Sequence, residues 1–90
     1  MHTTPRCILV DDNQDFLTVA ERYLSMICPE FEVISFLDAF AALDFLKKNR
    51  VELLVTDFHM PSFDGLRLTR AVRAFDPDIP IVMMSGDAVE

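Results

Sequence analysis

The stretch VTDFHMPSFDGL, residues 55–66, contains the pattern that decides the fold. An apolar run ends in an acidic side chain, Asp57, and a proline and a glycine follow a few residues later. A carboxylate at the mouth of a buried strand is costly unless its charge is paired or used there. The position of Asp57 therefore predicts a site that requires a negative charge at the end of this strand.

Length and composition limit the chain to a single domain. The 90 residues, of which 51% are hydrophobic, suffice for one folded unit and leave no room for a second. The net charge is −7 and the basic residues form no run, so direct binding to nucleic acid is not expected. No apolar run approaches the roughly 20 residues of a membrane span, and the N-terminus becomes acidic too early for a signal peptide. We expect one cytoplasmic domain over residues 1–90.

The two cysteines show no metal-binding pattern. Cys7 and Cys28 lack the C-x-x-C spacing, and no cluster of His and Cys residues surrounds them. Two buried thiols are favoured over a disulfide, because disulfides are rare in a reducing compartment.

Short apolar runs alternate with longer amphipathic segments, which is typical of βαβ units. The expected strands are 7–10, 31–36, 52–57 and 79–85, and the expected helices are 14–27, 39–48 and 66–75. The first strand is apolar throughout, so we expect both of its faces to be buried. The pattern predicts an α/β fold with a parallel sheet.

Each expected helix has an apolar face and a capping residue. The side chains expected to face the sheet are Phe16, Val19, Ala20, Tyr23 and Ile27 in the first helix, Ala39, Ala42, Leu43 and Leu46 in the second, and Leu68, Ala71, Val72 and Phe75 in the third. The expected N-caps are Asp12 or Asn13, Asp38 and Asp64, with Asp87 before a fourth helix that the chain barely begins.

Three of the expected strands end in polar side chains. Asp11 and Asp12 follow the first strand, Asp57 ends the third, and Ser85 ends the fourth. Parallel strands present their carboxyl ends at one edge, so the three carboxylates converge if the first and third strands are neighbours. Like charges this close need a shared proton or cation, and a cluster of oxygen ligands favours Mg²⁺. The sequence predicts a metal site that also accepts a phosphoryl group.

These residues together resemble the receiver domains of two-component response regulators. The resemblance rests on the acidic pair Asp11 and Asp12, on the motif D-x-x-M-P-x-x-D-G, and on a hydroxyl followed by a small residue. The motif residues are Asp57, Met60, Pro61, Asp64 and Gly65, and the hydroxyl pair is Ser85 and Gly86. The order and spacing of the three features match over nearly the whole chain.

The resemblance implies a fold and a set of roles. The fold would be a flavodoxin-like, doubly wound parallel sheet with strand order 2-1-3-4. Asp57 would accept a phosphoryl group from a histidine kinase or phosphotransfer protein. Asp12, Asp57 and the backbone carbonyl of His59 would bind Mg²⁺ directly, and Asp11 through water.

The remaining motif residues also have expected roles, from the resemblance for Ser85 and Gly86 and from their own chemistry for the others. Ser85 would hydrogen-bond the phosphoryl oxygens, and Gly86 would leave room for them. Pro61 removes a donor and fixes φ, while Gly65 permits a turn geometry that a side chain would forbid. Met60 would fill the core beside this loop.

The chain departs from the resemblance at its C-terminal end. A receiver domain continues through a fifth strand and a fifth helix, and a lysine and a switch aromatic on that part have no counterpart here. The domain is therefore expected to be incomplete after the fourth strand. The run IPIVMMS, residues 79–85, would form an apolar sheet edge that favours a homodimer through strand pairing.

Three other functions remain open on the sequence. A pseudo-receiver would keep the fold as a binding surface and no longer take up phosphate. A magnesium-dependent phosphatase with an aspartate nucleophile would usually carry a second acid two residues later, where this chain has His59. A nucleotide-binding domain would need a glycine-rich loop, which Gly65 and Gly86 cannot build.

Overall fold

The computed structural model describes residues 4–60 and 63–84. The elements in chain order are β1 (Arg6–Val10), α1 (Gln14–Ile27), β2 (Glu32–Phe36), α2 (Ala39–Lys48), β3 (Leu53–Asp57), α3 (Gly65–Arg73) and β4 (Ile81–Met84). The predicted features at Pro61, Ser85, Gly86 and Asp87 lie outside the described residues.

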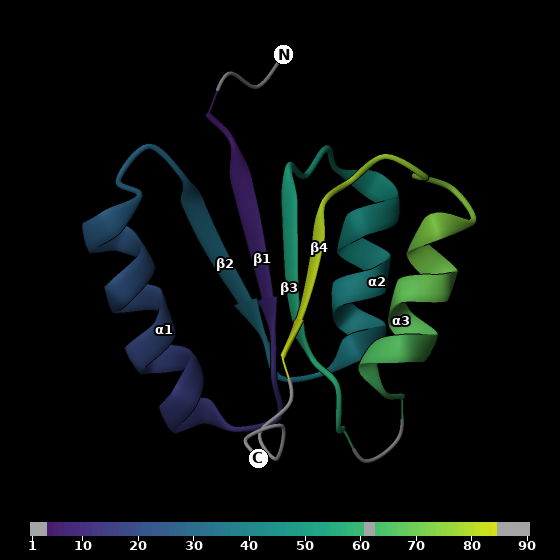
Figure 1. Ribbon diagram of the computed structural model, residues 1–90, viewed down its shortest axis with the longest axis horizontal. Helices are drawn as coiled ribbons and strands as arrows, with labels where there is room; N and C mark the ends of the chain where they lie inside the picture. The colour runs from purple at the N-terminus through teal and green to yellow at the C-terminus, as the bar shows by residue number, and fades with distance from the viewer. Residues whose placement is uncertain (1–3, 61–62, 85–90) are drawn as a thin grey trace.

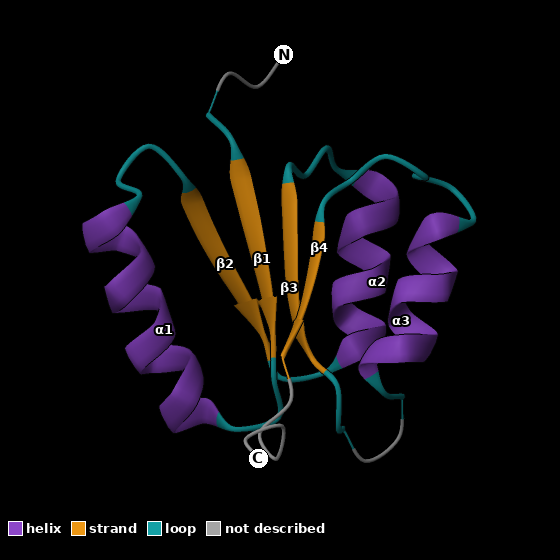
Figure 2. Cartoon of the chain, viewed as in Figure 1, coloured by secondary structure: helices purple, strands orange, loops and turns teal. Residues whose placement is uncertain are grey.

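The four strands form one parallel sheet with the order β2-β1-β3-β4. The predicted order is therefore confirmed, and no fifth strand is present among residues 4–60 and 63–84. The arrows in Figure 1 all point toward the same edge of the sheet. Figure 2 shows α1 on one side of the sheet and α2 with α3 on the other.

Each face of the sheet packs against a separate hydrophobic core. Ile8 and Val10 of β1 pack with Leu54 and the inner sides of α2 and α3. Cys7 and Leu9 of the same strand pack with Leu17 of α1. Alternate side chains of a strand point to opposite faces, so β1 is buried on both sides, as predicted.

The predicted buried face of α1 is wrong. Val19, Tyr23 and Ile27 are 66%, 60% and 54% exposed, and the side chain that faces the sheet most fully is Leu17. Ala20 and Leu24 pack beside Leu17. The apolar arc of α1 is wider than its contact with the sheet, and Ser35 of β2 donates a hydrogen bond to Glu21 of the same helix.

Two smaller predictions also need correction. Phe75 was expected on the buried face of the third helix, but α3 ends at Arg73 and Phe75 is 41% exposed in the turn that follows. Cys28 was expected to be buried, but it caps the C-terminal end of α1 and is half-buried. Both residues lie at helix ends, where helical periodicity no longer predicts which side faces the core.

The caps decide which acids remain available at the ends of the strands. Asn13, and not Asp12, caps α1, because its side chain accepts a hydrogen bond from the backbone N–H of Phe16 at 3.0 Å. Asp38 caps α2 and Asp64 caps α3 in the same way, as predicted. The Asp12 carboxylate is therefore not used in the cap.

Candidate functional site

Three carboxylates meet at the carboxyl ends of β1 and β3. Val10 of β1 is in register with Thr56 of β3, so the acids that follow these two residues are neighbours across the sheet. One oxygen from each of Asp11, Asp12 and Asp57 lies within 4.8 Å of the others. The convergence predicted for these acids is therefore present in the structure.

Asp11 is the buried member of the cluster, with 8% of its surface exposed. Its Oδ1 accepts a hydrogen bond from the backbone N–H of Asn13 at 2.9 Å. Burial raises the pKa of the Asp11 carboxyl, and the charges of Asp57 and Asp12 raise it further, while the Asn13 hydrogen bond acts in the opposite direction. The charged form of Asp11 therefore gains from a cation placed between the three acids.

Asp57 and Asp12 are the more accessible members of the cluster. Asp12 is exposed and Asp57 is half-buried. An open hollow of about 390 Å³ lies beside Asp12 and is also lined by His59, Met60 and Asp64. A ligand can therefore approach the cluster from the side of Asp12 and the loop that follows β3.

The loop after Asp57 is held close to the strand by its backbone. The N–H of Phe58 donates to the carbonyl of Met84 at 2.7 Å, and the N–H of Gly65 donates to the carbonyl of Phe58 at 3.1 Å. A Cβ atom at position 65 would lie 2.3 Å from the carbonyl oxygen of Asp57. Gly65 is required because the two backbones touch.

A glycine is needed at position 65, but the predicted reason, a special turn geometry, is wrong. No described glycine has a positive φ, so the backbone angles of Gly65 are open to other residues. The space around it is not, because α3 begins directly against Asp57.

Other predicted site residues surround the acids. His59 is exposed, and its ring lies edge-on to Phe58 with 4.8 Å between the ring centroids. Met60 packs against the larger core, as predicted. Asn13 was expected only as a possible cap of α1, and the hydrogen bond from its backbone N–H to Asp11 was not predicted. The signal available for that bond was Asp11 itself, because an Asp side chain often accepts from the backbone N–H two residues later.

The donor set fits a hard divalent cation. Carboxylate oxygens from three residues can reach one point, and no nitrogen or sulfur ligand is part of the group. Mg²⁺ and Ca²⁺ select such oxygen ligands, and Mg²⁺ usually keeps several waters, for which the adjoining hollow has room. Asp11, Asp12 and Asp57 are the residues that would hold the ion.

We expect Asp11→Asn to stabilise the metal-free protein by roughly 1 kcal/mol, because it removes a buried like charge and keeps the oxygen that accepts the Asn13 hydrogen bond. The same variant should lose most of the rise in melting temperature that Mg²⁺ gives the wild type. Thermal unfolding with Mg²⁺ or EDTA measures both effects. Glu30→Gln, an exposed acid outside the cluster, is the control. An unchanged response to Mg²⁺ in Asp11→Asn would exclude Asp11 from the site.

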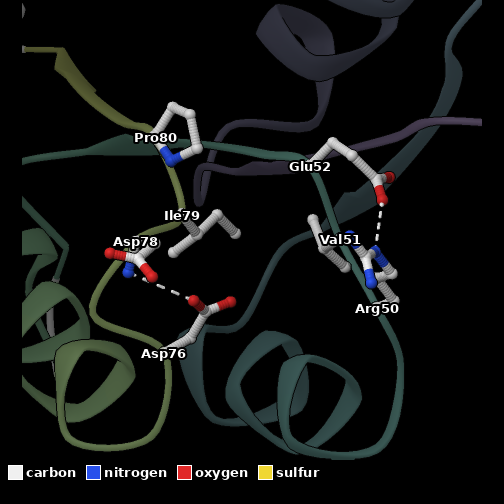
Figure 3. Close-up of a pocket in the computed structure, with 7 residues that line it drawn as sticks. All are labelled: Arg50, Val51, Glu52, Asp76, Asp78, Ile79 and Pro80. Atoms are coloured by element: carbon white, nitrogen blue, oxygen red, sulfur yellow. Dashed lines mark hydrogen bonds and ion pairs between the residues drawn. The ribbon is translucent and has the colours of Figure 1, made fainter.

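A second hollow of about 390 Å³ lies at the amino ends of the strands, where β3 and β4 begin (Figure 3). Three of its charged side chains, those of Arg50, Glu52 and Asp76, have partners within the protein. Arg50 pairs with Glu52 at 3.3 Å, and the Asp76 carboxylate accepts a hydrogen bond from the backbone N–H of Asp78 at 3.3 Å. Figure 3 shows both interactions along the walls of the hollow. The acid cluster at the carboxyl ends is therefore the stronger candidate site.

Fold and site together define an α/β domain with an acidic cluster at the carboxyl edge of its central strands. The family model of the response regulator receiver domain matches residues 7–90. The chain belongs to this family, so the resemblance drawn from the sequence is confirmed. It is a receiver domain of the type found in two-component systems.

Curated relatives are longer proteins that contain a similar segment. The chain is 39% identical to the transcriptional regulatory protein PrrA of Mycobacterium tuberculosis over 84 residues, which are 93% of this chain and 35% of PrrA. It is 34% identical to the C4-dicarboxylate transport transcriptional regulatory protein DctD of Rhizobium meliloti, covering 96% of this chain and 18% of DctD. The chain thus spans about a third or less of these relatives.

Solved structures show the same fold. A response regulator receiver protein from Pseudomonas putida matches with a TM-score of 0.83 at 27% identity, over 97% of this chain and 72% of that one. The chemotaxis protein CheY4 of Vibrio cholerae matches with a TM-score of 0.81 at 25% identity, over 90% and 68% of the two chains. Among the residues that the structure describes, no helix is both long and apolar enough to cross a membrane.

Proposed function

We propose that this chain is a phosphoacceptor module that takes a phosphoryl group onto Asp57 from a histidine kinase or a phosphotransfer protein. The observation that carries the proposal is the meeting of Asp57 with Asp11 and Asp12 at the edge of the sheet. On this proposal the chain receives the group and is not an enzyme with a substrate of its own. The same role implies a cytoplasmic location.

The chemistry follows from the position of Asp57. One oxygen of its carboxylate attacks the phosphorus of a phosphohistidine, the P–N bond breaks, and the histidine nitrogen leaves with the electron pair and takes up a proton. Phosphoryl transfer asks a protein mainly to position the groups and to balance the charge on the equatorial oxygens. Mg²⁺, when bound, supplies that positive charge.

The surrounding residues orient the nucleophile. The Asp11 carboxylate is held by Asn13, and the backbone of Asp57 lies directly against Gly65. We assign the backbone carbonyl of His59 as a further metal ligand. We also assign the Ser85 hydroxyl as a donor to the phosphoryl oxygens, Gly86 as the small residue that makes room for them, and Pro61 as the residue that fixes the loop.

The proposal is tested by phosphoryl transfer to the full chain. A histidine phosphotransfer domain carrying a radioactive phosphoryl group is mixed with the chain in Mg²⁺ or in EDTA. We expect label to appear on the chain only with Mg²⁺ and to be released by hydroxylamine, which cleaves acyl phosphates. Label that survives hydroxylamine, or no transfer to a folded chain from any of several donors, would contradict the proposal.

A second role, as a binding surface alone, is favoured by the exposed edge of the sheet. β4 is the edge strand, and Val82 and Met83 are 50% and 36% exposed. Within the described residues no strand pairs with its outer side. An exposed apolar edge strand favours pairing with another chain. We propose a homodimer through β4 as the form that this binding takes.

We expect the sedimentation coefficient of the wild type to rise with concentration, and that of Val82→Lys to stay at the monomer value, because a charged edge strand opposes pairing. Val19→Lys is the matched control, since Val19 is 66% exposed on α1. A wild type that remains monomeric up to high concentration would exclude the β4 dimer. An equal loss of association in Val19→Lys would move the interface to α1.

A further inference from the structure

The two cysteines line one small cavity between α1 and the sheet. The cavity has a volume of about 30 Å³, and its other walls are Leu24, Phe31, Val33 and Leu53. Cys7 enters it from β1, and Cys28 enters it from the C-terminal end of α1. Both cysteines therefore line one cavity, and Cys28 lies near enough to raise the pKa of the Cys7 thiol.

The two thiols differ in access to solvent. Cys7 is 2% exposed, whereas Cys28 is half-buried and lies where α1 ends. Burial raises the pKa of the Cys7 thiol to about 11, and the nearby Cys28 raises it as well. Cys28 is the more accessible of the two thiols, so a reagent in solution meets it first.

The backbone holds Cys28 in a defined place. Its N–H donates to the carbonyl of Leu24 at 2.8 Å, and its carbonyl accepts from the N–H of Phe31 at 3.1 Å. Leu24 and Phe31 are themselves walls of the cavity, so the end of α1 and the start of the next segment close over Cys7. The chain thus presents one accessible and one protected thiol at the same spot.

We propose that Cys7 and Cys28 form a reversible internal disulfide by exchange with small disulfides such as oxidised glutathione. The Cys28 thiolate attacks one sulfur of the reagent, which releases one glutathione thiolate and leaves a mixed disulfide on Cys28. Cys7, as its thiolate, then attacks the Cys28 sulfur and releases the second glutathione. Two protein thiols are oxidised and one molecule of oxidised glutathione is reduced to two of glutathione.

The bond would act on the segment that contains two of the three acids of the cluster. Asp11 and Asp12 lie between the two cysteines in the sequence, one at the end of β1 and the other before α1. A crosslink between β1 and the end of α1 restricts the unfolded chain and holds α1 against the sheet. We expect the oxidised protein to melt at a higher temperature than the reduced protein.

The test incubates the reduced, folded chain with oxidised glutathione and then blocks free thiols with N-ethylmaleimide under denaturing conditions. Intact mass is expected to show a product that has lost two hydrogen atoms and carries no maleimide. Cys7→Ser is expected to stop at the mixed disulfide on Cys28. In Cys28→Ser, glutathione should add to Cys7 more slowly by about tenfold or more, because Cys7 is buried and protonated.

Several results would overturn the proposal. A wild type that takes up two maleimides after long incubation, or that stops at the mixed disulfide, would show that the two sulfurs cannot meet. A product linked between two chains would assign Cys28 to a contact between molecules. Circular dichroism of both serine variants establishes that they are folded, so a missing disulfide cannot be caused by unfolding. The mass shift does not depend on phosphoryl transfer, so this test is separate from that of the proposed function.

Discussion

Asp57→Asn is expected to abolish phosphoryl uptake from a histidine phosphotransfer domain. Asparagine has nearly the same shape as aspartate, but its amide oxygen is a poor nucleophile and the cluster loses one of its three negative charges. Asp57 is half-buried at the end of β3, so the amide fits where the carboxylate lay. We expect no label above background in the presence of Mg²⁺, against clear labelling of the wild type.

Asp64→Asn is the matched control for this experiment. Asp64 lines the same hollow as Asp12 and lies outside the three-acid cluster. Its Oδ1 accepts a hydrogen bond from the N–H of Arg67 at 2.9 Å, and asparagine keeps this cap. We expect Asp64→Asn to retain labelling. If Asp57→Asn still accepted the group and Asp64→Asn did not, the nucleophile would be Asp64.

Gly65→Ala is expected to destabilise the fold by about 3 kcal/mol, which is at the upper end of the usual cost of overpacking. At an open position in a helix the same change would stabilise by up to about 1 kcal/mol. The sign is decided by the Asp57 carbonyl oxygen, which lies 2.3 Å from the place where the new Cβ would be. The carbonyl oxygen is a backbone atom, and the backbone also sets the position of the new Cβ. Neither atom can move aside by changing a rotamer.

We expect Gly65→Ala to slow phosphoryl uptake at the site as well as to lower the stability of the fold. To relieve the clash, α3 must move away from Asp57, and this loosens the loop that carries His59 and Met60. We expect phosphoryl uptake to slow in conditions where Gly65→Ala is still folded. Urea unfolding measures the stability, and Arg70→Ala, an exposed position on the same helix, is the control with a change near zero. A Gly65→Ala protein as stable as the wild type would show that α3 can shift freely.

The helix faces show how far periodicity alone can be used. The predicted faces of α2 and α3 are confirmed at Ala42, Leu46, Leu68 and Val72, which are all buried. The face of α1 was wrong, because its apolar residues cover a wide arc and periodicity does not say which part of that arc meets the sheet. The position of Leu17 depends on the packing of α1 against β1 and β2.

The sequence by itself determined the parallel α/β fold, the strand order through its resemblance to receiver domains, and the identity of the three acids. The fold class and the three acids follow from apolar runs that end in carboxylates, a pattern that the order of residues in the chain fixes. Only the tertiary structure decided that Asn13, and not Asp12, caps α1, that Gly65 is required by contact with Asp57, and that Cys7 and Cys28 share one cavity. The Gly65 contact and the shared cavity depend on distances between atoms in different helices and strands. The cap of α1 depends on a choice between two adjacent residues. Packing sets the distances and makes the choice.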